Sequence, residues 1–87
     1  MIAAKLIGTV WATRKATGLN GLKFMLAEEI SEGISGRNFI VVDIIGAGIG
    51  DRVIVSTGSS ARKVLGDENI PVDAVVIGII DDDCSLY

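Results

Sequence analysis

Histidine is absent from the sequence, and with it the commonest general base and the commonest metal ligand of proteins. The single cysteine, Cys84, has no partner for a disulfide within the chain, so we expect a reducing cytosol as the compartment. We therefore predict no metal site, and catalysis that depends on histidine is excluded.

Basic and aromatic residues are also few. Eight lysine and arginine residues stand against eleven acidic ones, giving a net charge of −3, and the basic residues are spread along the chain. One Trp, one Tyr and two Phe are the only large aromatics. A nucleic-acid-binding surface usually combines a basic stripe with aromatic side chains. We therefore predict no nucleic-acid partner.

Long apolar runs are missing as well. Charges or glycines interrupt each apolar segment before it reaches the roughly 18 residues that a membrane-spanning helix needs. The amino-terminal run is broken by Lys5 and has no basic region ahead of it, unlike a signal peptide. We expect a cytoplasmic protein without a membrane anchor.

What the chain does have is apolar residues in unusual proportion for its size. Its 87 residues suit one domain, spanning residues 1–87, and 49% of them are hydrophobic. A domain this small cannot readily hide so much apolar surface alone, which favours self-association.

The pattern of apolar residues and glycines predicts mostly strands. We expect a loop at 14–21, another at 31–37, a hairpin connection at 46–51 and a helix over 59–65 that Ser59 caps and Gly66 closes. Gly8 marks a bend or bulge in the first strand. The segment 22–30 also has tolerable helical spacing, although its β-type residues favour a strand. The strands are predicted at 2–13, 22–30, 38–45, 52–57 and 73–81. Five short strands with one helix indicate an all-β fold, a small closed or partly closed β-barrel.

Two of these strands are apolar on both faces. In 38–45, Phe39, Val41 and Ile45 alternate with Ile40, Val42 and Ile44, and residues 73–81 show the same two-sided pattern. A small barrel has one interior, so the second face needs a cover. We expect neighbouring subunits to provide most of it.

The glycine run GAGIGD at 46–51 invites comparison with a phosphate-binding loop. A dinucleotide fingerprint requires G-x-G-x-x-G between a strand and a helix, whereas here the spacing is G-x-G-x-G and a strand follows. We interpret the run as a tight hairpin and predict no cofactor site.

Two further motifs match catalytic or metal-binding patterns only in part. Ser60-Ala-Arg-Lys63 fits the S-x-x-K nucleophile motif, but the partner motifs of such enzymes are missing. The run Asp81–Asp83 lacks the alternating ligands and distant glutamate of a calcium loop, so we interpret it as a solvated strand end. We predict that Ser59 and Ser60 cap the helix and that Arg62 meets a carboxylate or carbonyl of another subunit.

Asp43 and Trp11 raise separate questions. Asp43 lies among apolar residues, so its carboxylate needs a partner, for which Arg52, Arg62 or backbone N–H groups are candidates. Trp11, like Phe39, is expected in the core or as an interface anchor.

Together, several motifs along nearly the whole chain resemble the bacterial microcompartment vertex family of the EutN/CcmL type. They are G-T-V-x-A-T-x-K from Gly8, G-x-K from Gly21, V-D-x-x-G-A-G-x-G-D/E-x-V from Val42, G-S-S-A-R from Gly58 and P-V-D-A-x-V-x-G-I-I-D from Pro71. The resemblance implies an OB-like five-stranded β-barrel with one short helix that assembles as a cyclic homopentamer. Such pentamers occupy the vertices of a polyhedral shell whose facets are tiled by hexameric shell proteins, so the implied role is structural rather than enzymatic.

For this assembly we predict a set of residues at or beside the subunit contacts, because two segments present backbone groups and charges without a local ligand. The set is Asp43, Gly46, Ala47, Gly48, Gly50, Asp51, Ser59, Ser60, Ala61 and Arg62. The alternative hypothesis is an OB-fold module that binds single-stranded nucleic acid or a small ligand, which the acidic composition disfavours. An enzyme is the third hypothesis, and no candidate catalytic residue supports it.

Overall fold

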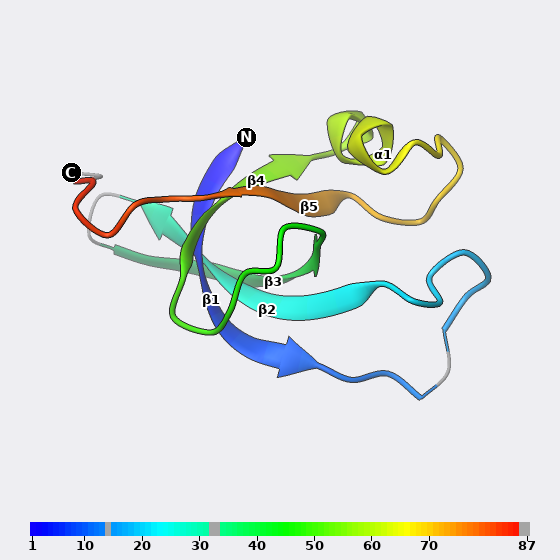
Figure 1. Cartoon of the computed structure of the whole chain (residues 1–87), viewed down its shortest axis with the longest axis horizontal. Coiled ribbons are helices and arrows are strands. Elements are labelled where there is room, and N and C mark those ends of the chain that lie inside the picture. The colour runs from blue at the N-terminus through cyan, green and yellow to red at the C-terminus, as the bar shows by residue number, and fades with distance from the viewer. Residues whose placement is uncertain (14, 32–33, 86–87) are drawn as a thin grey trace.

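The computed structural model describes residues 1–13, 15–31 and 34–85, which form five strands and one short helix (Figure 1). The strands close into a barrel in the order β1-β2-β3-β5-β4, with β4 pairing again with β1. The predicted small, OB-like, five-stranded barrel is therefore confirmed. The elements in chain order are β1 (Ile2–Val10), β2 (Lys23–Ser31), β3 (Ile34–Asp43), β4 (Arg52–Thr57), α1 (Ser59–Leu65) and β5 (Ala74–Ile79).

The strand order corrects one feature of the sequence-based prediction. β3 and β4 are not neighbours, because β5 lies between them, parallel to β3 and antiparallel to β4. The segment 46–51 is therefore not a hairpin. It is a crossover loop that connects β3 to β4, two strands that do not pair with each other. The pattern of strands along the chain does not reveal that β5 lies between β3 and β4, because β5 follows both of them, and the helix, in the sequence.

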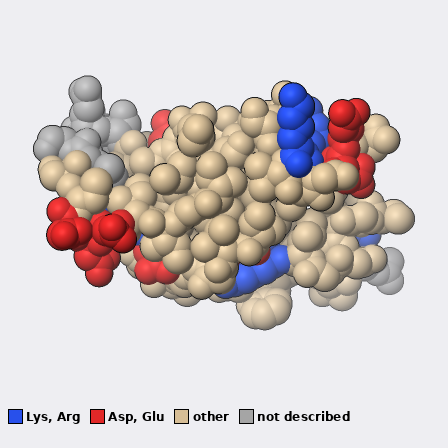
Figure 2. All heavy atoms as spheres, turned by 45° about the horizontal axis from the view of Figure 1, so that its top comes forward, with Lys and Arg blue, Asp and Glu red and all other residues tan. Residues whose placement is uncertain are grey.

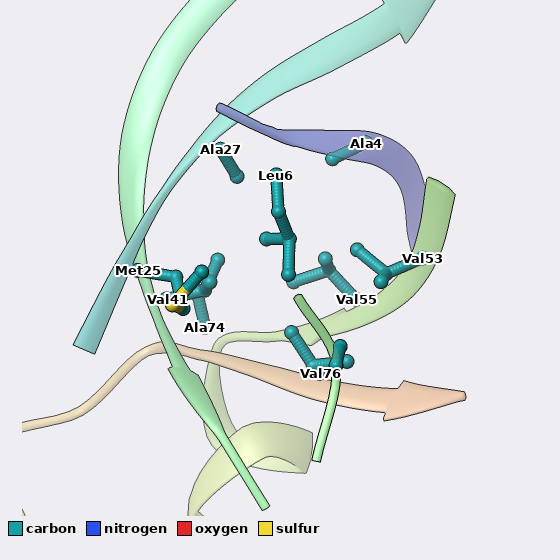
Figure 3. Packing of buried hydrophobic residues seen from close by; sticks show 10 residues of the cluster. Ala4, Leu6, Met25, Ala27, Val41, Val53, Val55, Ala74 and Val76 are labelled. Atoms are coloured by element: carbon teal, nitrogen blue, oxygen red, sulfur yellow. The ribbon is translucent and has the colours of Figure 1, made fainter. Parts of the chain in front are cut away.

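Small and β-branched side chains fill the barrel interior. Figure 3 shows residues of every strand directed into the space that the strands enclose. Leu6, Val53, Val55 and Val76 are completely buried there, and each alternates along its strand with a residue on the outer face. The interior cluster comprises Ala4, Leu6, Met25, Ala27, Val41, Ala47, Val53, Val55, Ala74 and Val76.

A second apolar cluster covers the outer face of β3 and β5. Val42 and Val75 pack there against Ala61 of α1 and against Ile70 and Val72 of the segment that leads into β5. The chain thus covers by itself much of the second face for which we predicted a neighbouring subunit. Ile40 of β3 and Ile79 of β5 stay exposed, and for them the cover by a neighbouring subunit stays a prediction.

The helix has the predicted bounds but a different cap. Gly58, with φ of 66°, is the N-cap residue, and its N–H donates to the carbonyl of Asp73. The cap position has no side-chain hydrogen bond, so the prediction that Ser59 and Ser60 cap the helix is wrong. Gly66 ends the helix in the left-handed conformation, as predicted, and its N–H donates to the carbonyl of Lys63.

The predicted loop at 31–37 is mostly strand. β2 continues to Ser31 and β3 already begins at Ile34, while residues 32 and 33 lie outside the described part of the chain. Gly36 explains the error. A Cβ at this position would lie 2.7 Å from the carbonyl oxygen of Glu29, so this glycine serves a close approach of two strands rather than a turn.

Strand ends and the bulge are set by pairing partners. β1 ends at Val10 rather than at the predicted Thr13. Val10 pairs with Phe24, the second residue of β2, so almost no β2 residue is left to pair with the chain after Val10. The register shifts between Leu6 and Gly8, which confirms the predicted bulge. The remaining strand bounds differ from the predictions by two residues or fewer at each end, except for the start of β3. The predicted loop at 14–21 is confirmed for residues 15–21, and residue 14 is outside the described ranges.

Candidate subunit-contact surface

The predicted contact residues fall in two separate segments, the crossover loop after β3 and the turn that starts α1. The first segment begins with Asp43, the last residue of β3, whose side chain is completely buried. Its Oδ1 accepts hydrogen bonds from the backbone N–H groups of Ile45, at 3.0 Å, and Gly46, at 3.2 Å. These bonds turn the chain sharply and end β3 two residues earlier than predicted.

The partner of Asp43 is a residue that sequence analysis missed. Lys23 Nζ lies 3.1 Å from Asp43 Oδ2, and the ladder between β2 and β3 pairs the same two residues. Lys23 and Asp43 thus form an ion pair between β2 and β3. The predicted backbone partners are confirmed, whereas Arg52 is occupied elsewhere, donating to the carbonyls of Asp81 and Asp82.

These contacts determine the charge of the Asp43 side chain. Burial raises the pKa of the carboxyl group, whereas the N–H of Ile45, the ammonium of Lys23 and the N–H of Gly46 lower it. The net pKa lies below the ordinary value of 3.8. Asp43 is therefore an anion at neutral pH and holds the loop in place, rather than acting as a proton donor.

The rest of the crossover loop is fastened to the barrel. Ala47 is 2% exposed and belongs to the interior cluster, and its carbonyl accepts a 2.7 Å hydrogen bond from Lys23 Nζ. Further along, Gly50 N–H donates to the carbonyl of Leu6, and Leu6 N–H donates to the carbonyl of Asp51. The loop thus closes the barrel with Ala47.

Most of the exposed positions of this loop are glycines, which have no side chain. Ile49 is 65% exposed between two exposed glycines, Gly48 and Gly50. The Asp51 carboxylate accepts a 2.8 Å hydrogen bond from Gly48 N–H, which keeps the turn narrow. The loop therefore presents bare backbone, Ile49 and the Asp51 carboxylate to its surroundings.

The second segment has the same two-sided character. Ala61 is completely buried in the outer cluster, while Ser59 and Ser60 are exposed. Arg62 is half-buried, and its Nη1 lies 3.5 Å from the carbonyl oxygen of Val72, at the long limit of a hydrogen bond. Its guanidinium therefore keeps capacity for a stronger partner.

Of the two places predicted for Trp11, the core and an interface, the structure excludes the core. The Trp11 side chain is 89% exposed, so it is not a core residue, although Phe39 does pack against the interior cluster. It lines a groove of about 490 Å³ whose other walls include Lys15, Leu22, Lys23 and Phe24. The run of small and polar residues after Trp11 was the available signal that this tryptophan lies beyond the end of a strand.

Neither a metal centre nor a membrane segment is found in the described ranges. No three His, Cys, Asp or Glu residues there come together to hold a metal ion. Asp81, Asp82 and Asp83 are exposed after β5, as expected for a solvated strand end. The helix of the described chain is too short to cross a membrane.

Comparison with known proteins gives matches over most of the chain. Residues 1–81 match the family described as "Ethanolamine utilisation protein EutN/carboxysome". The chain is 40% identical to the carboxysome shell vertex protein CcmL of Nostoc sp., over 93% of this chain and 83% of that protein. It is 43% identical to the bacterial microcompartment shell vertex protein GrpN of Rhodospirillum rubrum, over 93% of each chain.

The solved structures agree. The GrpN pentameric microcompartment shell protein from Rhodospirillum rubrum superposes with a TM-score of 0.83 and 40% identity, over 99% of this chain and all of that chain. A structure of the ethanolamine utilization protein EutN gives a TM-score of 0.88 and 38% identity, over 98% of this chain and 91% of that one.

Proposed function

This chain belongs to the EutN/CcmL family, and we propose that it is a structural protein that forms the pentameric vertices of a polyhedral bacterial microcompartment. The observation that carries the proposal is the full-length likeness to proteins named for a shell vertex, one of them solved as a pentameric shell protein. The barrel, the crossover loop and α1 all lie within the matched residues 1–81.

The role follows from geometry. A flat layer of hexagonal units cannot close on itself, and a closed polyhedron needs points of fivefold symmetry. A cyclic pentamer supplies such a point. We propose hexameric shell proteins as the partners around it, and the shell within the cytoplasm as its place. We assign the chain no reaction, because the vertex role requires none.

Within the pentamer, we propose that the accessible members of the predicted set lie at or beside the subunit contacts. Asp43, Ala47 and Ala61 are buried and support the contact indirectly, because they hold the two segments in position. Bare backbone around Ile49 permits close approach of another chain. The accessible members are Gly46, Gly48, Gly50, Asp51, Ser59, Ser60 and Arg62.

Oligomeric mass tests this function directly. With a chain of 9.1 kDa, native mass spectrometry should give five times that mass, about 45 kDa. A chain that stays at 9.1 kDa at every concentration would overturn the proposal. Production together with hexameric shell proteins should then give closed shells by electron microscopy, and omission of this chain should leave open sheets or tubes.

A further inference from the structure

The groove beside Trp11 combines an exposed aromatic with positive charge. Leu22 and Phe24 form apolar walls, and Lys15 and Lys23 are its charged residues. We call this surface the Trp11 groove. Fully exposed tryptophans are uncommon in isolated domains and are enriched among the residues that dominate protein interfaces. The groove therefore has the character of an unoccupied docking site.

A second apolar depression, of about 390 Å³, lies at the opposite end of β1. We call it the amino-terminal patch. Its residues include Met1, which is 84% exposed, Ile54, Ile80, Asp81 and Cys84.

The amino-terminal patch is acidic where the Trp11 groove is basic. Asp81 opens a run of three exposed aspartates, and Figure 2 shows acidic side chains gathered at the end of the molecule where Figure 1 places the carboxyl terminus. Arg52 adds one positive charge there and holds the tail by donating to the carbonyls of Asp81 and Asp82. The acidic groups are thus kept beside the apolar depression.

We propose that, in the pentamer proposed above, the Trp11 groove of one copy receives the amino-terminal patch of the next. Contacts in a cyclic pentamer are heterologous, so every subunit must offer two different surfaces that fit each other. The two patches meet this need: both are apolar, their charges are opposite, and their lining residues lie at the two ends of β1. Eight residue steps of a strand, at roughly 3.3 Å each, separate them along the chain.

The pairing also explains why the charges are arranged in this way. A contact of the Trp11 groove with itself would bring Lys15 of two copies together, and a contact of the amino-terminal patch with itself would juxtapose the aspartates. Like charges at an interface are repulsive, whereas the mixed contact places Lys15 against carboxylates. The Trp11 groove also lies next to the crossover loop, since Lys23 both lines the groove and holds Ala47.

The single native cysteine provides the experiment. Cys84 already lies in the amino-terminal patch, so a thiol introduced by Trp11→Cys should lie near Cys84 of the neighbouring subunit. A short bis-maleimide should then link subunits into a ladder from dimer to pentamer on a denaturing gel. Ala12→Cys, in the same groove, serves as a second variant and should give the same ladder.

Matched variants separate this pairing from others. Adding Cys84→Ser to Trp11→Cys should abolish the ladder, whereas a ladder cut down to a dimer would show that the groove pairs with itself. Glu68→Cys, which places a thiol at an exposed position outside the predicted contact segments, should give no ladder. The proposal is overturned if the wild type is a pentamer by mass and both groove variants stay unlinked.

Two more measurements complete the test. Trp11→Ala should raise the concentration at which the pentamer half-dissociates by roughly tenfold or more, as expected for a buried tryptophan anchor. Quenching of Trp11 fluorescence in the wild-type pentamer by a single-stranded oligonucleotide would instead assign the groove to nucleic acid and overturn the proposal. A wild type that never exceeds 9.1 kDa refutes the vertex function itself, which is a distinct result.

Discussion

Lys23 and Asp43 face each other across the first residue of β2 and the last residue of β3, with Nζ 3.1 Å from Oδ2. The same ammonium donates to the carbonyl of Ala47, 2.7 Å away, which places one side chain between the barrel wall and the residue that closes it. Strand pairing, the turn after β3 and the position of the crossover loop thus depend on one ion pair.

Removing the negative charge of Asp43 should destabilise the fold. Asp43→Asn keeps an oxygen for the N–H groups of Ile45 and Gly46 but loses the attraction to Lys23, and we expect a loss of about 1–2 kcal/mol in the free energy of unfolding. Asp43→Ala also leaves these two N–H groups without an acceptor. The free energy of unfolding should therefore fall by about 2–4 kcal/mol. Urea unfolding followed by circular dichroism measures both. Equal stability of the three proteins would contradict the role given to this carboxylate.

Acid should erase the difference between the wild type and Asp43→Asn. The pKa of Asp43 in the folded state is below its ordinary value of 3.8, so the folded state favours the carboxylate. Its contribution is therefore complete above that ordinary value and is lost as the pH falls through the lower, folded pKa. The free energy of unfolding, measured from pH 7 down to pH 2, should show the two proteins converging only below about pH 4. Convergence between pH 5 and 7 would contradict the lowered pKa.

The sequence was most informative where local pattern decides structure. Residues 52–57 and 59–65 have the predicted bounds because a run of β-branched residues and a capped turn each leave little choice. It was least informative where a distant partner decides. Ile44 and Ile45 continue an apolar pattern, yet the chain turns away at Asp43 because Lys23 and two N–H groups hold that carboxylate.

The contact surface shows the same division. Glycines and serines in the segments 46–51 and 58–62 indicated exposed backbone, and the structure places them at the surface. The prediction for Trp11 left core and interface open, because a tryptophan at the end of a strand is suited to both, and only the small and polar residues after it indicated exposure. Whether Trp11 lies in the core depends on where β2 begins, and the pairing between strands determines that position.

Gly36 should be intolerant of any side chain. A Cβ there would lie 2.7 Å from the carbonyl oxygen of Glu29 and 3.0 Å from its Cβ, so the two strands would have to separate. We expect Gly36→Ala to lower the free energy of unfolding by about 1–3 kcal/mol. Gly8→Ala is the matched control, since the Cβ added in β1 would meet Leu26 at an ordinary 3.7 Å. Thermal unfolding of both variants tests this, and a smaller loss for Gly36→Ala than for Gly8→Ala would refute it.

Arg52 should control the order of the tail but little of the global stability. Its guanidinium donates to the carbonyls of Asp81, at 2.7 Å, and Asp82, at 3.2 Å, and both bonds are exposed. In Arg52→Ala the turn in which Cys84 N–H donates to Asp81 should open more often. Amide exchange of Cys84 should then be about tenfold faster or more, while the free energy of unfolding changes by about 1 kcal/mol or less. Unchanged exchange would show that the tail does not depend on Arg52.

Arg62 is expected to act on assembly rather than on folding. Its hydrogen bond to Val72 is at the 3.5 Å limit, so Arg62→Ala should change the free energy of unfolding of the single chain by less than about 1 kcal/mol. Its half-buried guanidinium would become fully buried if α1 lies at the subunit contact. Removing one partner of a buried charge pair costs ~3–5 kcal/mol of binding free energy. Removing one partner of an exposed pair costs under ~1 kcal/mol. We therefore expect the half-dissociation concentration of the pentamer to rise by about 100-fold or more in dilution experiments. Lys63→Ala, which removes the exposed neighbouring charge, should leave it nearly unchanged. Equal behaviour of the two variants would mean that Arg62 stays in water and that the contact lies elsewhere on the barrel.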